Sequence, residues 1–253
     1  MTGYSFGDTE LAAERLHVLD AVFAPTTDAL LDGLPRLPAR IADLGCGPGA
    51  TTARLVDRWP AARVTGVDTS EAFLATARAG VPAADFVAAD VTAPLPGAPY
   101  DLVYARFLLA HLPDVAAAVR AWVAALGSGG VLVLEETEHI ASSDPWFARY
   151  ETVSYGRVAS AGAHVYAGAD ITAAIPAGVE VVLDRVIELD PTAGEAAGMF
   201  WRNLATWGPD AVAQGLLTEA DRDALLTHLR NRVDDPARGL FSWTHHQTVL
   251  RRA

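Results

Sequence analysis

A glycine-rich turn after a short apolar run is the feature that most restricts how this chain folds. Residues 41–50 read Ile-Ala-Asp-Leu-Gly-Cys-Gly-Pro-Gly-Ala, and a helix-compatible segment, 51–59, follows. This pattern predicts a strand, a tight turn and a helix. Gly45, Gly47 and Gly49 lack the Cβ atom that keeps a ligand off the backbone, and they permit positive φ angles. The turn is therefore predicted to hold a ligand directly against the main chain.

The glycines alone leave two classes of ligand open. Gly45, Gly47 and Ala50 satisfy the dinucleotide fingerprint G-x-G-x-x-G/A, which is a weak signal by itself and keeps an NAD-dependent oxidoreductase as an alternative. Asp43, at the end of the predicted strand, decides between them. Its carboxylate repels a pyrophosphate and attracts an ammonium group. S-adenosylmethionine carries an ammonium group and no phosphate, so it is the favoured ligand.

The next two predicted strands also end in acids. Residues 63–68 form a β-type run that ends at Asp68, at roughly the spacing expected for a carboxylate that binds a ribose diol. The run 85–90 ends at Asp90, which is suited to accept a hydrogen bond from an adenine amino group, with Val91 beside the ring. Three successive strand ends thus supply carboxylates to one predicted site.

At this point the chain resembles the class I S-adenosylmethionine-dependent methyltransferases, in the small-molecule branch of menaquinone- and trans-aconitate-methyltransferase-like enzymes. The matching pieces occur in the family's order over about residues 35–140. They are Asp43-Leu-Gly-Cys-Gly-Pro-Gly, Gly66-Val-Asp68, Phe86-Val-Ala-Ala-Asp90, Tyr100-Asp-Leu-Val-Tyr-Ala-Arg106, His111-Leu-Pro-Asp114 and Gly129-Gly-Val-Leu-Val-Leu-Glu135.

The resemblance implies S-adenosyl-L-methionine as cofactor and S-adenosyl-L-homocysteine as product. It also implies a set of cofactor-binding positions: Asp43, Gly45, Gly47 and Gly49 for the methionine moiety, Asp68 for the ribose with Thr69 in the same group, Asp90 and Val91 for the adenine, and Arg106 at the cofactor's border. In the family, segments like Tyr4–Gly7 and Arg15-Leu16 fold over the cofactor mouth, although packing alone also accounts for them here.

Apolar β-type runs alternate with helical stretches from Ile41 to Leu134, which predicts an α/β fold with a parallel sheet. Two later β-type runs, 179–190 and 242–250, complete a doubly wound, mostly parallel seven-stranded sheet with an antiparallel last strand, as in the resembled family. The stretch 8–32 is predicted to form two short N-terminal helices separated near Pro25. Bulky helical stretches before and after residues 179–190 are predicted to form a helical cap.

We expect a single methyltransferase domain over residues 1–253. Its parts are an N-terminal helical lid at 1–34, a cofactor-binding core at 35–140 and cap insertions at 141–178 and 191–235.

Methyl transfer needs a base only when the acceptor starts protonated. His139, expected just past the fifth strand beside Glu138, is the first candidate, and Tyr155 and His164 in the cap are the others. A loop histidine without a role explains His139 equally well. Several of the aromatic residues Trp146, Phe147, Tyr150, Tyr155, Phe200 and Trp201 are expected to line the acceptor pocket, with Tyr155 and Trp201 favoured, although plain core packing is the common role of such residues. Histidines and acids show no metal-ligand spacing, so no metal is predicted.

Composition restricts the partners. The net charge of −12 disfavours nucleic acid and acidic membrane surfaces, and no apolar run is long enough to span a membrane. The single cysteine, Cys46, excludes an intramolecular disulfide and fits a reducing, cytoplasmic location. We expect a soluble monomer or homodimer that acts on a small-molecule acceptor.

The favoured function is methyl transfer from S-adenosylmethionine to an oxygen, nitrogen or carbon atom of a small organic acceptor. The alanine- and arginine-rich, lysine-poor composition is similar to that of a high-GC bacterium, in which enzymes of this kind often modify secondary metabolites. A protein of the same fold that binds S-adenosylmethionine without methylating, such as a cyclase or a regulatory protein, remains an alternative, and the NAD-dependent oxidoreductase remains a weaker one.

Overall fold

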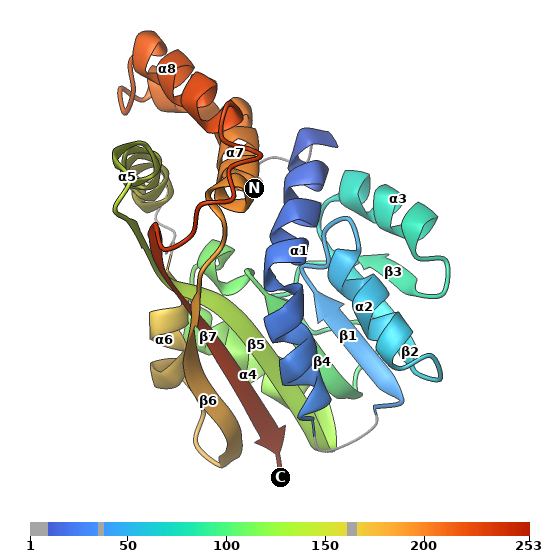
Figure 1. Cartoon of the computed structure of the whole chain (residues 1–253). Helices are drawn as coiled ribbons and strands as arrows, with labels where there is room; N and C mark the ends of the chain where they lie inside the picture. The colour runs from blue at the N-terminus through green and yellow to red at the C-terminus, as the bar shows by residue number, and fades with distance from the viewer. Residues whose placement is uncertain (1–9, 35–37, 161–165) are drawn as a thin grey trace.

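The computed structural model describes residues 10–34, 38–160 and 166–253. Its centre is one seven-stranded sheet with the strand order β3-β2-β1-β4-β5-β7-β6 (Figure 1). The strands are β1 (Arg40–Leu44), β2 (Arg63–Asp68), β3 (Asp85–Ala88), β4 (Tyr100–Arg106), β5 (Leu126–Ser142), β6 (Val179–Leu189) and β7 (Phe241–Arg252).

Strand directions confirm the predicted sheet. β1 pairs in parallel with β2 and β4, β2 with β3, and β4 with β5. Only β7 runs against its neighbours, since it is antiparallel to both β5 and β6. The strand order reverses between β1 and β4, and in sheets of this kind ligands bind in the crevice outside the carboxyl ends of the strands at that point.

Helices cover both faces of the sheet. They are α1 (Glu10–Asp32), α2 (Ala50–Arg58), α3 (Glu71–Gly80), α4 (Val115–Ala124), α5 (Pro145–Ser160), α6 (Gly168–Ala174), α7 (Ala193–Ala213) and α8 (Glu219–Arg230), with a 3-10 turn, η1 (Leu109–His111). Side chains of α1 and α2 pack on one face, where Leu31 and Leu55 are buried. Side chains of α4 and α6 pack on the other, where Trp122 and Ile171 are buried.

The N-terminal stretch differs from the prediction of two short helices. It forms one helix, α1, that contains Pro25. Proline removes one backbone donor, but packing of the apolar face outweighs that local cost: Phe23, Leu30 and Leu31 on both sides of Pro25 are buried. Thr26 and Thr27 add polar contacts, the first from its hydroxyl to the Phe23 carbonyl and the second to the Glu135 carboxylate.

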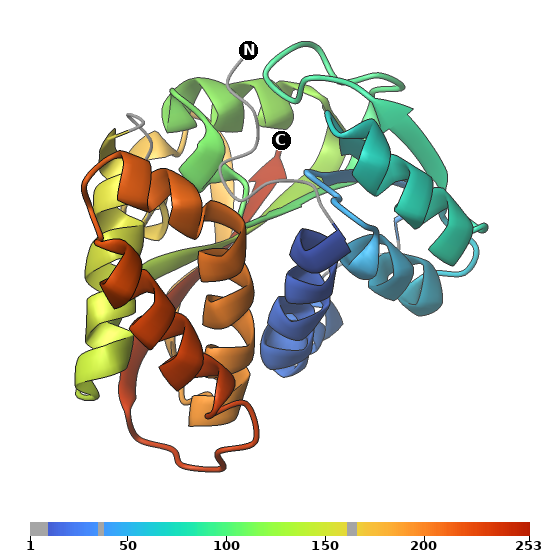
Figure 2. The same cartoon turned by 90° about the horizontal axis from the view of Figure 1, so that it is seen from above.

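Strand β5 runs from Leu126 to Ser142 and so extends past His139, which we expected to lie just beyond its end. Its second half pairs with β7 as far as the match between Ser142 and Phe241. His139 therefore lies within β5, opposite Thr244, and not just past the strand as we expected. Beyond this extension stand α5, α7 and α8, gathered on one side of the molecule when it is seen from above (Figure 2).

The cap helices share a second hydrophobic core with part of α1. Phe147 and Tyr150 of α5, Phe200 and Trp207 of α7, and Phe23 of α1 are buried together. Helix α5 begins where the Asp144 carboxylate accepts hydrogen bonds from the backbone N–H groups of residues 146 and 147, and α7 begins with a capping box at Thr192. The helical stretch predicted before residue 179 is divided between α5 and α6.

Candidate cofactor and acceptor site

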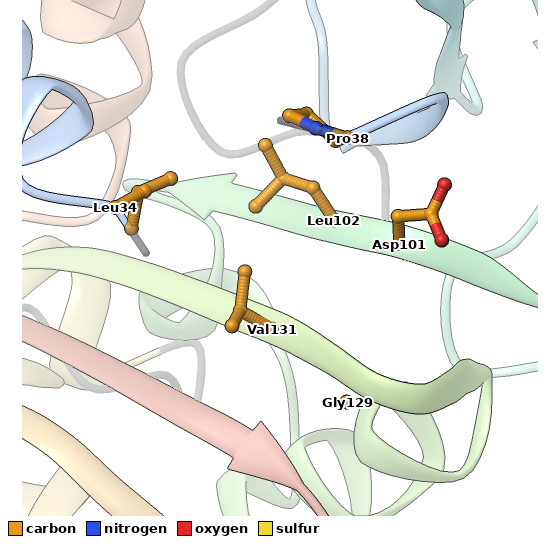
Figure 3. A pocket seen from close by; sticks show the side chains of 6 residues that line it. All are labelled: Leu34, Pro38, Asp101, Leu102, Gly129 and Val131. Atoms are coloured by element: carbon orange, nitrogen blue, oxygen red, sulfur yellow. The ribbon is translucent and has the colours of Figure 1, made fainter. Parts of the chain in front are cut away.

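A cavity of about 890 Å³ lies at the carboxyl ends of the central strands, between the core and the cap. The glycine turn and residues at or after the ends of β2, β3 and β4 form one side, while α1, α5 and α7 contribute residues to the other. This volume is in the range of sites for drug-sized ligands. A second hollow, of about 10 Å³, is bordered by Leu34, Leu102 and Val131 and has room for about one water molecule (Figure 3).

Gly45 and Gly47 line the cavity in left-handed conformations, with φ angles of 63° and 52°. A Cβ atom on Gly45 would stand 2.8 Å from Cδ1 of Leu108. Gly49, with φ 92°, does not line the cavity; a Cβ there would meet Ala77 of α3 at 3.0 Å. Gly45 and Gly47 therefore form a cradle for a ligand, and Gly49 allows close packing at the start of α2.

Asp68 lines the cavity and organises the turn. Its Oδ2 accepts a hydrogen bond from the Gly47 N–H over 2.9 Å, and its Oδ1 accepts one from the Ser70 N–H over 2.8 Å. A carboxylate has about four acceptor positions, so both oxygens keep capacity for a ligand's hydroxyl groups. Thr69 lines the same part of the cavity.

Asp90 and Val91 also border the cavity. Oδ1 of Asp90 accepts hydrogen bonds from the N–H and the hydroxyl group of Thr92, over 2.8 and 2.7 Å, and these bonds lower its pKa. Val91 is buried, and its carbonyl accepts a hydrogen bond from the Trp122 indole over 2.9 Å. The two residues are thus fixed where the resemblance implies the adenine.

Asp43 does not line the cavity among the described residues. Its side chain is buried and accepts a 2.6 Å hydrogen bond from the Thr52 hydroxyl of α2. Burial raises its pKa to about 7, with the charges of Asp68 and Asp20 adding to the effect. The carboxylate expected to meet an ammonium group directly thus lies behind the glycine turn, where it joins β1 to α2.

Arg106 borders the cavity at the end of β4 and joins three elements. Its guanidinium pairs with Asp20 of α1 at 2.6 Å and donates hydrogen bonds to the Thr27 and Thr51 hydroxyl groups. Asp20 also pairs with Arg54 of α2 at 2.9 Å. Its interactions with Tyr104, Glu135 and Asp20 outweigh burial and raise the pKa of Arg106. Arg106 therefore holds α1 against the cofactor side of the sheet.

Glu135 forms a buried polar network beneath Arg106. Its carboxylate accepts hydrogen bonds from the Tyr104 hydroxyl, the Thr27 hydroxyl and the Gln247 amide, the last over 2.7 Å. His245 lies 3.4 Å from it. Burial opposes ionisation of Glu135, but its contact with His245 and its other polar neighbours outweigh burial and lower the pKa to about 2.

Of the predicted catalytic residues, the structure brings Tyr155 to the cavity wall. His139 is exposed and outside the wall, and its ring lies 5.6 Å from the ring of Tyr166, which does line the cavity. His164, Tyr4 and the rest of segment 4–7 lie outside the described residues. Arg15 and Leu16 do line the cavity.

Three of the six aromatic candidates line the cavity and three do not. Tyr150, Tyr155 and Phe200 line the cavity, and the rings of Tyr150 and Phe200 stack at 4.2 Å. The other three stand outside the wall: Trp146 stacks on His228, Phe147 is buried in the cap core, and Trp201 lies beneath Arg202 and Arg230.

Two carboxyl groups in the wall were not identified from the sequence. Glu136 follows Glu135 on β5 and is buried; burial raises its pKa to about 8. Glu151 of α5 is partly buried, and burial raises its pKa to about 7. Neither was recognisable, because the first depends on the extension of β5 and the second on how α5 is docked.

Cationic groups face the same space. Arg15 of α1 and Arg157 of α5 both line the cavity. The Arg157 guanidinium lies 5.6 Å from the Trp207 ring and forms no ion pair with any described residue. Between the cap helices, the Asn203 amide donates a 2.8 Å hydrogen bond to the Tyr150 hydroxyl. In the described ranges no group of three His, Cys, Asp or Glu residues is arranged to hold a metal, and no helix is long and apolar enough to cross a membrane.

Known proteins match both the glycine turn and the chain around it. A family described as "Methyltransferase domain" matches residues 41–130. Trans-aconitate 2-methyltransferase of Escherichia coli O7:K1 (strain IAI39 / ExPEC) is 35% identical over 205 residues, which are 77% of this chain and 77% of that protein. The enzyme of that name from Azoarcus sp. (strain BH72) is 41% identical over 136 residues, 49% of this chain and about half, 54%, of that protein.

Solved structures agree in fold. Coclaurine N-methyltransferase bound to N-methylheliamine and SAH has a TM-score of 0.56 and 16% identity, over 94% of this chain and 72% of that chain. The [4+2]-cyclase SpnF has a TM-score of 0.60 and 17% identity, over 99% of this chain and 97% of that chain. One fold thus serves different reactions, so the sequence relatives carry the assignment of chemistry.

The fold and the glycine cradle define a class I S-adenosylmethionine-dependent methyltransferase. Within that class, the chain belongs to the family that includes the trans-aconitate 2-methyltransferases. Its cofactor is S-adenosylmethionine, its product from that cofactor is S-adenosylhomocysteine, and its acceptor is a small molecule. The NAD-dependent alternative is thereby set aside.

Proposed function

We propose that the acceptor is a small carboxylic acid and that the product is its methyl ester. The observation that carries this proposal is the Arg157 guanidinium, which lines the cavity and forms no ion pair with a described carboxylate, the Asp210 carboxylate acting on it only from a longer distance. A buried or half-buried guanidinium favours an anionic partner and binds carboxylates with two parallel hydrogen bonds. Arg15 adds positive charge to the same wall, and relatives named for trans-aconitate support the choice.

The cofactor fits the cradle through residues that the structure places in the wall. Gly45 and Gly47 would hold its methionine part, Asp68 and Thr69 its ribose, Asp90 and Val91 its adenine, with Arg106 at the border. Asp43 would act through Thr52 and the turn, and Gly49 through packing. When bound, S-adenosylmethionine supplies an electrophilic methyl carbon on a sulfonium.

The chain's residues then have to orient the acceptor and exclude water. An acceptor carboxylate oxygen forms the new bond to the methyl carbon as the carbon–sulfur bond breaks, and the electron pair of that bond stays on sulfur. A carboxylate is already ionised, so no residue needs to remove a proton. Positioning by Arg157 and the aromatic wall, in a cavity closed by the cap, supplies the rate enhancement. Tyr155 would line the acceptor side, whereas the roles predicted for His139 and His164 are then unnecessary.

A second candidate acceptor is an amine, because Glu136 and Glu151 place two carboxyl groups in the same wall. An ammonium group would have to lose a proton before methylation, and Glu136, with a pKa near 8, would be the base. The charge of the acceptor thus separates the two candidates.

Product analysis tests the proposal. The protein is incubated with S-adenosylmethionine and trans-aconitate, other small di- and tricarboxylates, and a matched set of amines. Formation of S-adenosylhomocysteine in equal amount with a methyl ester supports a carboxylate acceptor. Methylated amines without esters would replace it with the second candidate, and no product heavier by one methyl group would favour a non-methylating role.

Domain organisation, partners and location complete the proposal. We infer a single domain in which segment 1–34 forms a lid and segments 141–178 and 191–235 cap the acceptor. The net charge of −12 supports a small molecule over nucleic acid as partner. The one cysteine, Cys46, is buried, which is compatible with the predicted cytoplasmic location. A monomer or homodimer, and a place in bacterial secondary metabolism, stay predictions.

A further inference from the structure

Glu136 is a buried acid whose two oxygens have different surroundings. Its Oε1 accepts hydrogen bonds from the backbone N–H groups of Leu108 and Leu109, over 2.7 and 2.6 Å. Its Oε2 accepts none from the described residues, although Glu136 lines the cavity. One oxygen is therefore committed to the protein, and the other is available to a ligand.

The two hydrogen bonds to Oε1 of Glu136 fix the position of Oε2. Leu108 and Leu109 follow Phe107, whose φ angle of 55° is left-handed, so successive N–H groups converge on the carboxyl group. Leu108 in turn approaches Gly45 so closely that a Cβ on that glycine would clash with it. The free oxygen of Glu136 therefore belongs to a rigid unit that touches the cofactor cradle.

We propose that Glu136 acts in its protonated form and donates a hydrogen bond from Oε2 to a carboxylate of the acceptor. This inference rests on the proposed carboxylate acceptor. A protonated carboxyl group is a hydrogen-bond donor, whereas an ionised one accepts only and repels an anion. Glu136 thus selects an anionic acceptor by staying neutral and orients it beside the cradle.

Burial and a charged neighbour favour the neutral form of Glu136. Burial raises the pKa of Glu136 to about 8, the nearby Glu135 carboxylate adds to this, and the two backbone donors oppose it. His246, opposite Glu136 on β7, directs its imidazole to Asp184 of β6 at 2.7 Å.

Besides the cofactor-side residues Asp68, Asp90 and Arg106, titratable groups of the wall come from α1, η1 and α5. Burial, with a smaller contribution from Arg15, lowers the pKa of His111 to about 4, so His111 stays neutral above that value. Within the wall, Glu151, with a pKa near 7, titrates in the same range as Glu136, and Asp43 titrates near 7 behind the glycine turn. A Glu151→Gln background removes the first contribution, and the part of the pH dependence that Glu136→Gln then removes is assigned to Glu136.

Binding of trans-aconitate to the S-adenosylhomocysteine complex, measured by calorimetry from pH 6.5 to 9, tests the inference. In the Glu151→Gln background the affinity should fall about tenfold between pH 7 and 9, because only the protein with neutral Glu136 binds. Adding Glu136→Gln, which keeps a donor and an acceptor, should remove this dependence. Glu138→Gln, two residues along β5 with its carboxylate 3.7 Å from His246, is the matched control and should keep it.

A second measurement requires no substitution at Glu136, so it does not depend on whether the Glu136→Gln variant folds. At pH 8, titrations in buffers of different ionisation enthalpy should show uptake of about half a proton per acceptor bound. Release of protons, or an affinity that is flat or rises with pH, overturns the inference while leaving the carboxylate acceptor in place. Failure of trans-aconitate and every other small carboxylate to bind at any pH overturns the proposed acceptor and this inference together.

Discussion

Asp68 accepts a hydrogen bond from the backbone N–H of Gly47 over 2.9 Å, so the residue assigned to the ribose also holds the glycine turn. The bond joins the end of β2 to the turn after β1. The other carboxylate oxygen of Asp68, Oδ1, accepts a hydrogen bond from the N–H of Ser70, just before α3. Ligand contact and cradle geometry therefore depend on one carboxylate.

Asp68→Ala should weaken S-adenosylhomocysteine binding by about 2 kcal/mol, roughly 30-fold, because a ligand contact and the anchor of Gly47 are lost together. Titration calorimetry measures the affinity. Asp85→Asn, at an exposed ion pair with Arg63 at the start of β3, is the control and should bind normally. Unchanged affinity in Asp68→Ala would refute the ribose assignment.

Gly45→Ala should lower the free energy of unfolding by about 1–3 kcal/mol and weaken cofactor binding, because the new methyl group meets Leu108 at 2.8 Å in a left-handed conformation. Gly80→Ala, where a Cβ would meet nothing within 4 Å, should leave both quantities nearly unchanged. Chemical denaturation and thermal shift with S-adenosylhomocysteine report on the pair. Equal effects of the two substitutions would show that the cradle is not crowded.

Arg106→Met should destabilise the fold by about 3 kcal/mol, because it removes the cation from a buried cluster with Asp20 and Glu135. Adding Asp20→Asn to this variant should recover part of the loss. Arg63→Met, at an exposed ion pair, should cost less than about 1 kcal/mol. Urea unfolding measures all three, and a small effect of Arg106→Met would mean that α1 is held by apolar packing alone.

Arg157→Met should raise the KM for the carboxylate acceptor at least tenfold, about 1.4 kcal/mol, with unchanged affinity for S-adenosylhomocysteine. Arg157 lines the cavity from α5, whereas Gly45, Gly47 and Asp68 belong to the turn and strand of the core. Arg149→Met, at an exposed position on the same helix, is the control. Steady-state kinetics measure the KM of both variants. A normal KM in Arg157→Met would remove the support for the proposed carboxylate acceptor.

Buried acids should make the unbound protein less stable as pH rises from about 5 to 8. The folded-state pKa values of Asp43, near 7, and Glu136, near 8, lie above their unfolded values. Their contribution is therefore complete below the unfolded pKa and is lost as pH rises through the folded pKa, with a slope of at most about 1.4 kcal/mol per pH unit for each proton. Asp43→Asn should reduce this slope.

Denaturation at intervals of pH measures the dependence. Glu135 acts in the opposite direction, because its folded pKa, near 2, lies below the ordinary value, and its contribution is lost only in strong acid. Maximal stability is therefore expected in mildly acid solution. Stability that increases from pH 5 to 8 would contradict the neutral state of the two acids.

Local patterns were enough to predict the sheet and the cradle. Apolar runs that end in Asp68 and Asp90, and glycines at 45 and 47, report on backbone geometry over a few residues, and the structure places all of them at the carboxyl edge. The direction of the Asp43 side chain could not be read in this way, since it depends on Thr52 of the next helix.

The part of the cavity wall that we propose for the acceptor was less accessible to prediction. Glu136 belongs to it only because β5 continues past Glu135 by pairing with β7, a partner about a hundred residues away in sequence. Arg157 and Glu151 belong to it because of the way α5 docks against α7. Pairing and docking between distant segments leave no periodic signal in either segment alone.

The long β5 strand carries the chain from the core to the cap. Ser142 of β5 is paired with Phe241 of β7, and Leu189 of β6 with Trp243, so three of the four chain connections between core and cap, those of β5, β6 and β7, lie at nearly the same level. The α7–α8 part of the cap, which we propose to contact the acceptor, can thus be exchanged as a module by joining a new segment at the paired ends of β6 and β7. The cradle, which lies on the far side of that boundary, keeps its own geometry and its cofactor.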